Sequence, residues 1–202
     1  RFFAIREVYA YAKHCIPCSK ITNKPWINNI GFDISKAKYN QPTNLKKEII
    51  SIVHAPSNLK VKGTKYVRKA ISEVKKLGYK INYRELVGIP NQKVQEIISS
   101  SDIVIDQMLL GEAGTLCFEG MGLGKPVISY YPDELKSELY PDFPIFNANI
   151  ENLKDKIIEL ANNEKLRFEL GKKGRKFVLE NLNYNKVQEE VLDEYRKIGF
   201  NI

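Results

Sequence analysis

Short apolar runs alternate with amphipathic stretches along most of the chain. The apolar runs predict buried β-strands at residues 49–54, 81–87, 103–105 and 127–131, with a shorter strand near 145–146. Apolar residues spaced three or four positions apart predict helices at 63–77, 91–100, 150–162, 165–182 and 184–197. Strands that alternate with helices of this length indicate βαβ units. The predicted fold class is therefore α/β, a Rossmann-like doubly wound parallel sheet flanked by helices.

The first 45 residues do not follow this pattern. Residues 1–13 carry the broad apolar face of a helix, whereas Pro17, Pro25 and Pro42 indicate turns. The chain also opens without Met, which is typical of a piece of a longer protein. We therefore predict two parts. Residues 1–45 are a hinge or the remnant of a preceding domain, and residues 46–202 form a ligand-binding domain.

Composition and charge narrow the choice of partners. The chain has 202 residues, of which 43% are hydrophobic and 28% charged, as in ordinary globular proteins. No apolar run approaches the roughly 20 residues of a membrane span, and no signal peptide is visible, so we expect a cytoplasmic protein. The net charge of +8 favours an anionic partner unless the lysines only solvate the surface. Because the basic residues are not interleaved with aromatic ones, we predict no nucleic acid as partner. Two candidate partners remain: a phosphorylated small molecule, and the anionic inner face of a membrane to which the protein would bind peripherally.

The three cysteines give no metal or disulfide framework. Cys15 and Cys18 have the spacing of half a zinc site, but no second pair follows. Cys117 lies among apolar residues of a short predicted helix and is expected in the core. We therefore predict no metal site.

The segment from Gly111 to Tyr131, GEAGTLCFEGMGLGKPVISYY, carries the chemistry. It reads as a turn of small residues, a short helix with Glu119 about one turn inside it, a Gly-Lys-Pro break and an apolar strand. The first backbone N–H groups of a helix have no partner within it and attract anions. We expect Gly114, Thr115 and Leu116 to face phosphate groups, while Glu119 accepts hydrogen bonds from sugar hydroxyls. Three glycines in and after the helix, at positions 120, 122 and 124, are costly for a helix and indicate a closely packed neighbour.

Two other loops should join this corner, because open α/β sheets bind ligands at the carboxyl ends of their strands. These loops are residues 55–63 and 87–91, and the corner itself belongs to the loop of residues 106–115. The first contains Lys60 and Lys62, whose ammonium groups would offset the charge of a diphosphate unless they only solvate the loop. We expect His54 to be a buried, hydrogen-bonded residue rather than a base, and we assign no catalytic role to Asp102 or Asp106.

The stretch Glu119 to Ile128, EGMGLGKPVI, resembles the second half of the donor-binding signature of GT-B glycosyltransferases of the glycosyl transferases group 1 family. The resemblance extends over about residues 49–182. At the position of the family's first Glu the chain has Gly111, and the nearest acid is Glu112. Lys62 with Gly63 matches the family's Lys-Gly pair, and Asn58 or Lys60 stands where an Arg is usual. The resemblance also places the backbone around Val87 against the nucleobase.

This resemblance implies the C-terminal, donor-binding domain of an enzyme that transfers sugar from a UDP- or GDP-linked nucleotide-diphospho-sugar. The acceptor would be a glycan or a lipid-linked glycan of surface polysaccharide synthesis, and no cofactor is implied. Acceptor contacts and efficient transfer would require the N-terminal GT-B domain, so this chain alone is expected to bind the donor. The implied catalytic residues are Lys62 and Lys60, and the implied donor-binding residues are Glu119, Gly114, Thr115, Leu116, Gly111, Glu112, Asn58 and Val87. A nucleotide-sugar epimerase of similar architecture and a non-catalytic module for a phosphorylated ligand are the alternatives.

Overall fold

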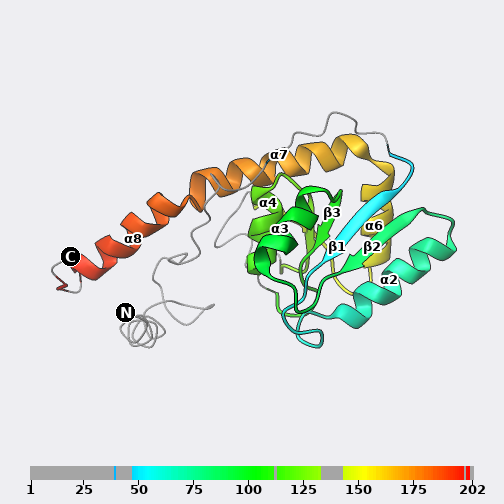
Figure 1. Ribbon diagram of the computed structural model, residues 1–202, viewed down its shortest axis with the longest axis horizontal. Coiled ribbons are helices and arrows are strands. Elements are labelled where there is room, and N and C mark those ends of the chain that lie inside the picture. Colours follow the sequence, from blue (N-terminus) through cyan, green and yellow to red (C-terminus); the bar gives the residue numbers. More distant parts are fainter. Residues whose placement is uncertain (1–38, 40–46, 112, 133–142, 198, 201–202) are drawn as a thin grey trace.

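A parallel sheet of five strands forms the centre of the domain (Figure 1). The computed structural model describes residues 39, 47–111, 113–132, 143–197 and 199–200. The strand order is β2-β1-β3-β4-β5, and all neighbouring pairs are parallel. The strands are β1 (Ile50–His54), β2 (Ile81–Glu85), β3 (Ile103–Ile105), β4 (Val127–Ser129) and β5 (Phe146–Asn147). Each of the three residues of β3 and of β4 is buried, as expected for strands covered on both faces.

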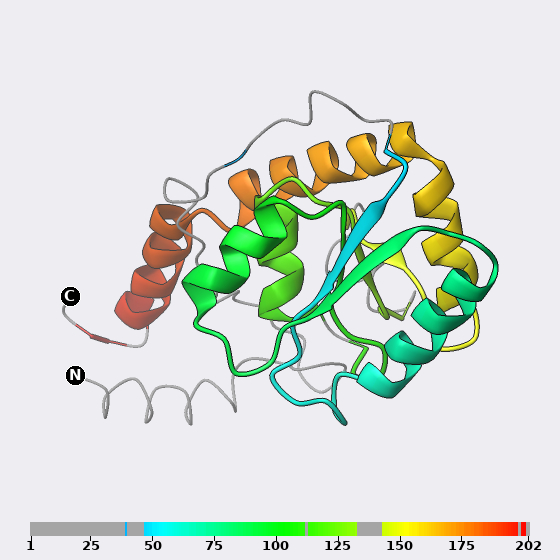
Figure 2. The same ribbon diagram turned by 45° about the vertical axis from the view of Figure 1, so that its right-hand side comes forward.

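Helices cover both faces of this sheet (Figure 2). On one face, α2 (Thr64–Lys76) and α6 (Leu153–Asn162) bury one apolar cluster. On the other face, α3 (Asn91–Ser99), α4 (Thr115–Gly122) and α7 (Glu164–Asn181) bury a second cluster, which includes Cys117. The last helix, α8 (Tyr184–Lys197), continues beyond α7 and extends away from the sheet in both views. The predicted doubly wound α/β fold and the core position of Cys117 are confirmed.

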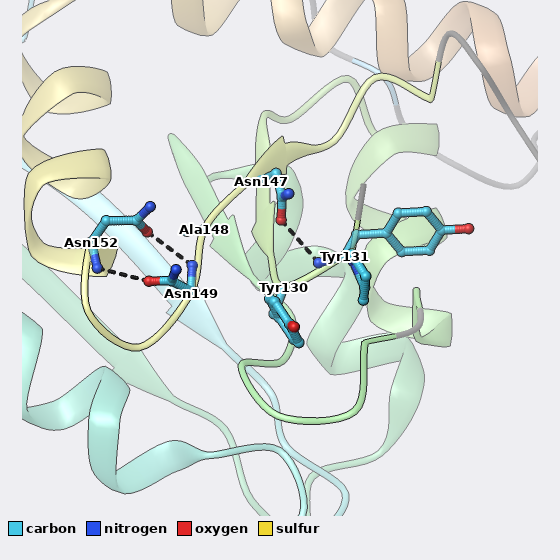
Figure 3. A pocket seen from close by; sticks show the side chains of 7 residues that line it. Tyr130, Tyr131, Asn147, Ala148, Asn149 and Asn152 are labelled. Carbon is cyan, nitrogen blue, oxygen red and sulfur yellow. Dashed lines mark hydrogen bonds between the residues drawn. The ribbon is translucent and has the colours of Figure 1, made fainter. Parts of the chain in front are cut away.

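Three boundaries differ by two residues or more from those predicted. The strand predicted at 127–131 ends at Ser129, and the N–H of Tyr131 donates to the Asn147 side chain. The strand predicted at 81–87 ends at Glu85, because after Leu86 the chain turns through Gly88, whose φ is 68°. The helix predicted at 150–162 begins at Leu153. Before it, the backbone N–H of Asn149 donates to Asn152 Oδ1 at 2.8 Å and that of Asn152 donates to Asn149 Oδ1 at 3.0 Å, which closes a turn (Figure 3). The helix and turns expected within residues 1–38 lie outside the described residues.

Glycines allow α4 to pack closely on both of its neighbours. A methyl group at Gly120 would lie 2.9 Å from Val127 Cγ2, so this position brings the helix down onto the sheet. On its other side α4 meets α7, where a methyl group at Gly171 would overlap the carbonyl oxygen of Gly124. Arg175 of α7 donates to the carbonyl oxygen of Gly122. The close neighbour expected from the glycines of α4 is therefore confirmed, and it is both a strand and a helix.

His54 ties together the elements that carry the loops of the sheet edge. Its side chain is fully buried, with Nδ1 2.8 Å from the carbonyl oxygen of Ile105 and Nε2 2.9 Å from Oγ1 of Thr64. A carbonyl oxygen only accepts, so Nδ1 carries the proton and Nε2 accepts from the hydroxyl. Burial lowers the pKa of the imidazole below its ordinary value of 6.5. His54 is thus a neutral link between β1, β3 and the start of α2, as its expected structural role requires.

No helix among the described residues is both long and apolar enough to cross a bilayer.

We predict that Gly171→Ala lowers the free energy of unfolding by about 1–3 kcal/mol, because the added methyl group forces α7 away from α4. The gain in helix propensity, roughly 1 kcal/mol, does not offset this overlap. Urea denaturation measures the change. Lys172→Ala, at an exposed position of the same helix, is the control and should stay within about 0.5 kcal/mol of the wild type. A Gly171→Ala protein as stable as the control would contradict the close packing of the two helices.

We predict that His54→Gln makes stability less dependent on pH between 7 and 5. Below pH 6.5 the unfolded chain binds a proton at His54 that the folded chain does not bind, so the unfolding free energy of the wild type falls as the pH falls. The variant lacks this contribution, and its curve should be flatter. Denaturation at several pH values measures both slopes. Parallel curves would show that His54 titrates alike in the folded and unfolded chains.

Candidate functional site

Two loops meet at the carboxyl edge of the sheet, between β1 and β3. These strands are neighbours, with His54 opposite Ile105, and the strand order reverses at this point. The backbone N–H of Met108 donates to the carbonyl oxygen of Lys62 at 3.1 Å, which joins the loop after β3 to the loop after β1. Ligands of open α/β sheets bind at such a reversal. Residues 55–63 and the described residues of 106–114 therefore form one corner, as the sequence predicted.

The loop after β1 is held by Asn58. Its Oδ1 accepts hydrogen bonds from the backbone N–H groups of Lys60 at 3.0 Å and Val61 at 3.1 Å, and its carbonyl oxygen accepts one from Lys62. Asn58 thus shapes the turn that presents Lys62 to the corner. Lys60 is exposed and forms no ion pair with any described residue, whereas the side chain of Lys62 is only 15% exposed. The two lysines therefore have different surroundings, and Lys62 is the one that faces inward.

Lys62 forms an ion pair with a buried carboxylate. Its Nζ lies 3.3 Å from Asp106 Oδ1, and Asp106 is completely buried at the carboxyl end of β3. The second oxygen of Asp106 accepts a hydrogen bond from the backbone N–H of Gly114 at 2.7 Å. A methyl group at Gly114 would lie 2.5 Å from Lys62 Nζ and 2.8 Å from Asp106 Oδ1. The ammonium group, the carboxylate and the entrance to α4 are therefore within contact distance of one another.

The first turn of α4 offers unused hydrogen-bond donors. Gly114 is the residue before the helix, and no side chain caps it. The backbone N–H groups of Thr115 and Leu116 have no acceptor among the described residues, and Thr115 is exposed. The first turn of α4 contains no acidic residue. This helix end can accept an anion through two amides, with Lys62 beside it.

Glu119 lies one turn further along α4 and faces α3. Its side chain is 6% exposed, and Oε1 accepts hydrogen bonds from Asn91 Nδ2 at 2.7 Å and Gln95 Nε2 at 3.3 Å. Oε2 has no partner among the described residues. Two side-chain amides thus fix the carboxylate beside the loop after β2, with one oxygen left to accept a hydrogen bond. Sequence reasoning found Glu119 but not Asn91 or Gln95, because only the packing of α3 on α4 brings them together.

Gly111 occupies a backbone position that suits glycine. Its φ is 70°, and an added methyl group would lie 3.2 Å from the ring of Pro132. The buried Gln107 holds the preceding turn, because its Oε1 accepts from the N–H groups of Leu109 and Leu110 and its Nε2 donates to the carbonyl oxygen of Tyr130. The position of the family's first Glu therefore carries no side chain in this corner, and Glu112 lies outside the described residues.

The loop after β2 completes the same edge. Val87 is 53% exposed and Ile89 is 37% exposed, with Gly88 between them. Their side chains contribute no charge, so any polar contact of this loop comes from its backbone. Val87 thus stays a predicted contact through its main chain.

A cavity of about 300 Å³ opens further along this edge, at the ends of β4 and β5 (Figure 3). Asn147 at its wall accepts a hydrogen bond from the backbone N–H of Tyr131, and Asn149 and Asn152 form the turn before α6. The cavity is lined by Tyr130, Tyr131, Pro132, Asn147, Ala148, Asn149 and Asn152.

Within the described part of the chain, no three His, Cys, Asp or Glu side chains cluster as metal ligands would. Cys15 and Cys18 lie outside that part. The donors of the corner are amides and one ammonium group, which suit an anion rather than a metal ion.

Comparison with known proteins identifies the fold. The family model of glycosyl transferases group 1 matches residues 38–177. Sucrose-phosphate synthase from Thermosynechococcus elongatus is similar in structure, with a TM-score of 0.65, 15% identity and coverage of 96% of this chain and 56% of that protein. A TarM variant from S. aureus, in complex with fondaparinux, alpha-GlcNAc-glycerol and UDP, has a TM-score of 0.61 and 20% identity, over 87% of this chain and 40% of TarM.

HepE from Anabaena, in complex with UDP and glucose, is similar with a TM-score of 0.62 and 12% identity, over 83% of this chain and 55% of HepE. The chain thus spans between about two fifths and slightly more than half of these proteins. No curated protein sequence matches it. The match of the family model over more than half of the chain and the shared architecture agree with the resemblance found in the sequence. The chain belongs to the family of glycosyl transferases group 1, and its fold is that of the C-terminal-type domain of GT-B glycosyltransferases.

Proposed function

We propose that this chain is the donor-binding domain of a glycosyltransferase that moves a sugar from a UDP- or GDP-linked nucleotide-diphospho-sugar to an acceptor. The observation that carries this proposal is the arrangement of Lys62, the open first turn of α4 and Glu119 along one edge of the sheet. The presence of UDP in the TarM and HepE structures supports a nucleoside diphosphate as ligand.

The diphosphate would lie at the start of α4. The N–H groups of Thr115 and Leu116 would donate to its oxygens, and Lys62, next to Gly114, would pair with the β-phosphate. As the bond to the sugar breaks, negative charge grows on this phosphate, and a fixed ammonium group stabilises that charge more than it stabilises the ground state. Lys62 is therefore the catalytic residue that we propose, and Lys60, exposed on the same loop, is the second.

The nucleoside would extend toward α3. Glu119 presents Oε2 without a described partner, while Asn91 and Gln95 hold Oε1. A carboxylate is acceptor-only, so it suits the two hydroxyls of a ribose. The base would then reach the loop of Val87, where backbone groups read its edge.

The sugar acceptor and the companion domain would lie beyond the same edge. All three loops of this edge expose large apolar side chains, at 37–53% exposure, that the described residues do not cover. These are Leu59, Val61, Val87, Ile89, Leu109 and Leu110. An apolar rim around a polar corner fits closure by a second domain. We propose the N-terminal GT-B domain as this partner, with efficient transfer to a surface glycan or lipid-linked acceptor requiring it.

We further propose that the parent enzyme works in the cytoplasm, where an anionic membrane surface would attract its basic side chains. The exposed face of α7 carries Lys165, Lys172, Lys173 and Lys176, of which only Lys176 has a described ion pair, with Glu180 at 3.8 Å. Such a cluster is attracted to anionic lipids.

One observation favours a second candidate, a module that binds a phosphorylated ligand without chemistry. Gly111, with its positive φ and its contact with Pro132, stands where the family's first Glu is expected. The epimerase alternative has no such support, because both nitrogens of His54 are already bonded to Ile105 and Thr64.

We predict that Glu119→Ala weakens binding of UDP or GDP by about 1–3 kcal/mol, because the bonds to the ribose hydroxyls are lost. Calorimetry with the ribo- and 2′-deoxyribonucleotides gives a sharper test. The deoxy form should bind the wild type more weakly, and the variant should distinguish the two forms less. Glu96→Ala removes an exposed carboxylate from α3 and should change neither affinity. A folded Glu119→Ala protein with full affinity would refute the assignment.

We predict that Lys62→Met weakens UDP or GDP binding by about 1.5–3 kcal/mol, since a charge-assisted contact to the β-phosphate is lost. The binding of UMP or GMP should be weakened less than that of the diphosphates. Lys65→Met, at an exposed position two residues after Gly63, is the matched control. Circular dichroism establishes that each variant is folded. An equal loss for the diphosphate and the monophosphate would place Lys62 away from the β-phosphate.

A further inference from the structure

Asp106 is a carboxylate at a place that should attract anions. It is fully buried at the end of β3, and its two oxygens contact the Lys62 ammonium group at 3.3 Å and the Gly114 N–H at 2.7 Å. An ammonium group and an amide N–H are both donors, so both oxygens accept, as those of an ionised carboxylate do. Burial raises the pKa of this carboxyl, while Lys62 and the Gly114 N–H lower it. Because both of its oxygens face donors, Asp106 brings a negative charge to the entrance of the helix that we propose as the phosphate site.

This charge removes part of the attraction that the corner would have for a phosphate. The positive charge of Lys62 is paired, and the N–H of Gly114, one of the amides expected to face phosphate, is bonded to Asp106. Only the N–H groups of Thr115 and Leu116 remain without a described acceptor. Lys62 and Asp106 together carry no net charge, and an arriving diphosphate competes with Asp106 for Lys62.

No other charged group among the described neighbours of Asp106 offsets its negative charge. His54, on β1, is neutral because burial lowers its pKa, and its two nitrogens are bonded to Ile105 and Thr64. The thiol of Cys117, on α4, is buried, and burial raises its pKa, so it stays uncharged. Glu119 points toward α3, away from this pair. Among the described groups packed around the start of α4, Lys62 and Asp106 therefore set the local charge.

We propose that Asp106 is a positioning residue that holds Lys62 over the first turn of α4 and limits how tightly the corner retains a nucleoside diphosphate. The proposal rests on the function proposed above. In transfer, the bond between the anomeric carbon and the phosphate oxygen breaks with its electron pair on that oxygen. The acceptor oxygen bonds to the carbon and gives its proton to solvent rather than to the leaving phosphate. The leaving nucleoside diphosphate thus carries one more negative charge than the bound donor did. Asp106 therefore repels the diphosphate product more strongly than it repels the donor.

The test compares Asp106→Asn with Asp102→Asn. Both replace an aspartate at an end of β3 by its neutral isostere, but Asp102 lies at the opposite end of the strand, paired with Lys47. Calorimetry measures the affinity of each folded protein for UDP, UDP-glucose and UMP, and for GDP, GDP-glucose and GMP, at two salt concentrations. Asp106→Ser replaces the asparagine variant if that protein does not fold.

Asp106→Asn is expected to bind the nucleoside diphosphate about three- to tenfold more tightly than the wild type does, with a smaller gain for the sugar-linked form and for the monophosphate. Its affinity should also fall more steeply with salt, because one positive charge is no longer paired. Asp102→Asn should match the wild type.

Weaker or unchanged binding of the diphosphate by Asp106→Asn, while the wild type binds it, would overturn this inference alone. An equal gain in affinity for the diphosphate, its sugar-linked form and the monophosphate would also overturn it, because Asp106 would then not distinguish product from donor. If the wild type binds none of the six nucleotides, the function proposed above fails, and this inference fails with it.

Discussion

The close approach of α4 to the sheet is the constraint on which the rest of the structure depends. Gly120 lets the helix lie directly on Val104 and Val127, and Gly171 of α7 closes over its other side against Gly124. A helix that lay further from the sheet would carry its first turn away from the ends of β1 and β3. The unused amides of Thr115 and Leu116 would then not face the loop of Lys62. Packing between backbones thus determines where the polar groups of the corner meet.

Much of the fold could be predicted from the sequence because parallel strands are buried on both faces. Such strands read as continuous apolar runs, and β3 was located to the residue. The boundaries that differ from the prediction depend on loop chemistry that hydrophobicity does not encode. At β2 the chain turns through Gly88 with positive φ, and at α6 the side chains of Asn149 and Asn152 close a turn before the first helical residue.

The candidate site was predictable where one segment carries it or where loops follow neighbouring parallel strands, as for Lys62. The start of α4 and Glu119 lie within a few positions of each other, so their spacing alone places them. The partners of these groups come from elsewhere in the chain. Lys62 and Asp106 are separated by 44 positions, and Asn91 lies 28 positions before Glu119. No spacing rule relates such residues, and only the topology of the sheet brings them together. For that reason Asp106, which the sequence placed beside β3 without a role, became informative once its two contacts were known.

Gly111 has a consequence for how this corner could change over evolution. A side chain at that position would need a left-handed backbone conformation and would press on the ring of Pro132. Substituting an acid there would therefore strain the loop, and the ring of Pro132 would have to shift. An engineer who wished to introduce such an acid would have to redesign Gly111 and Pro132 as one unit.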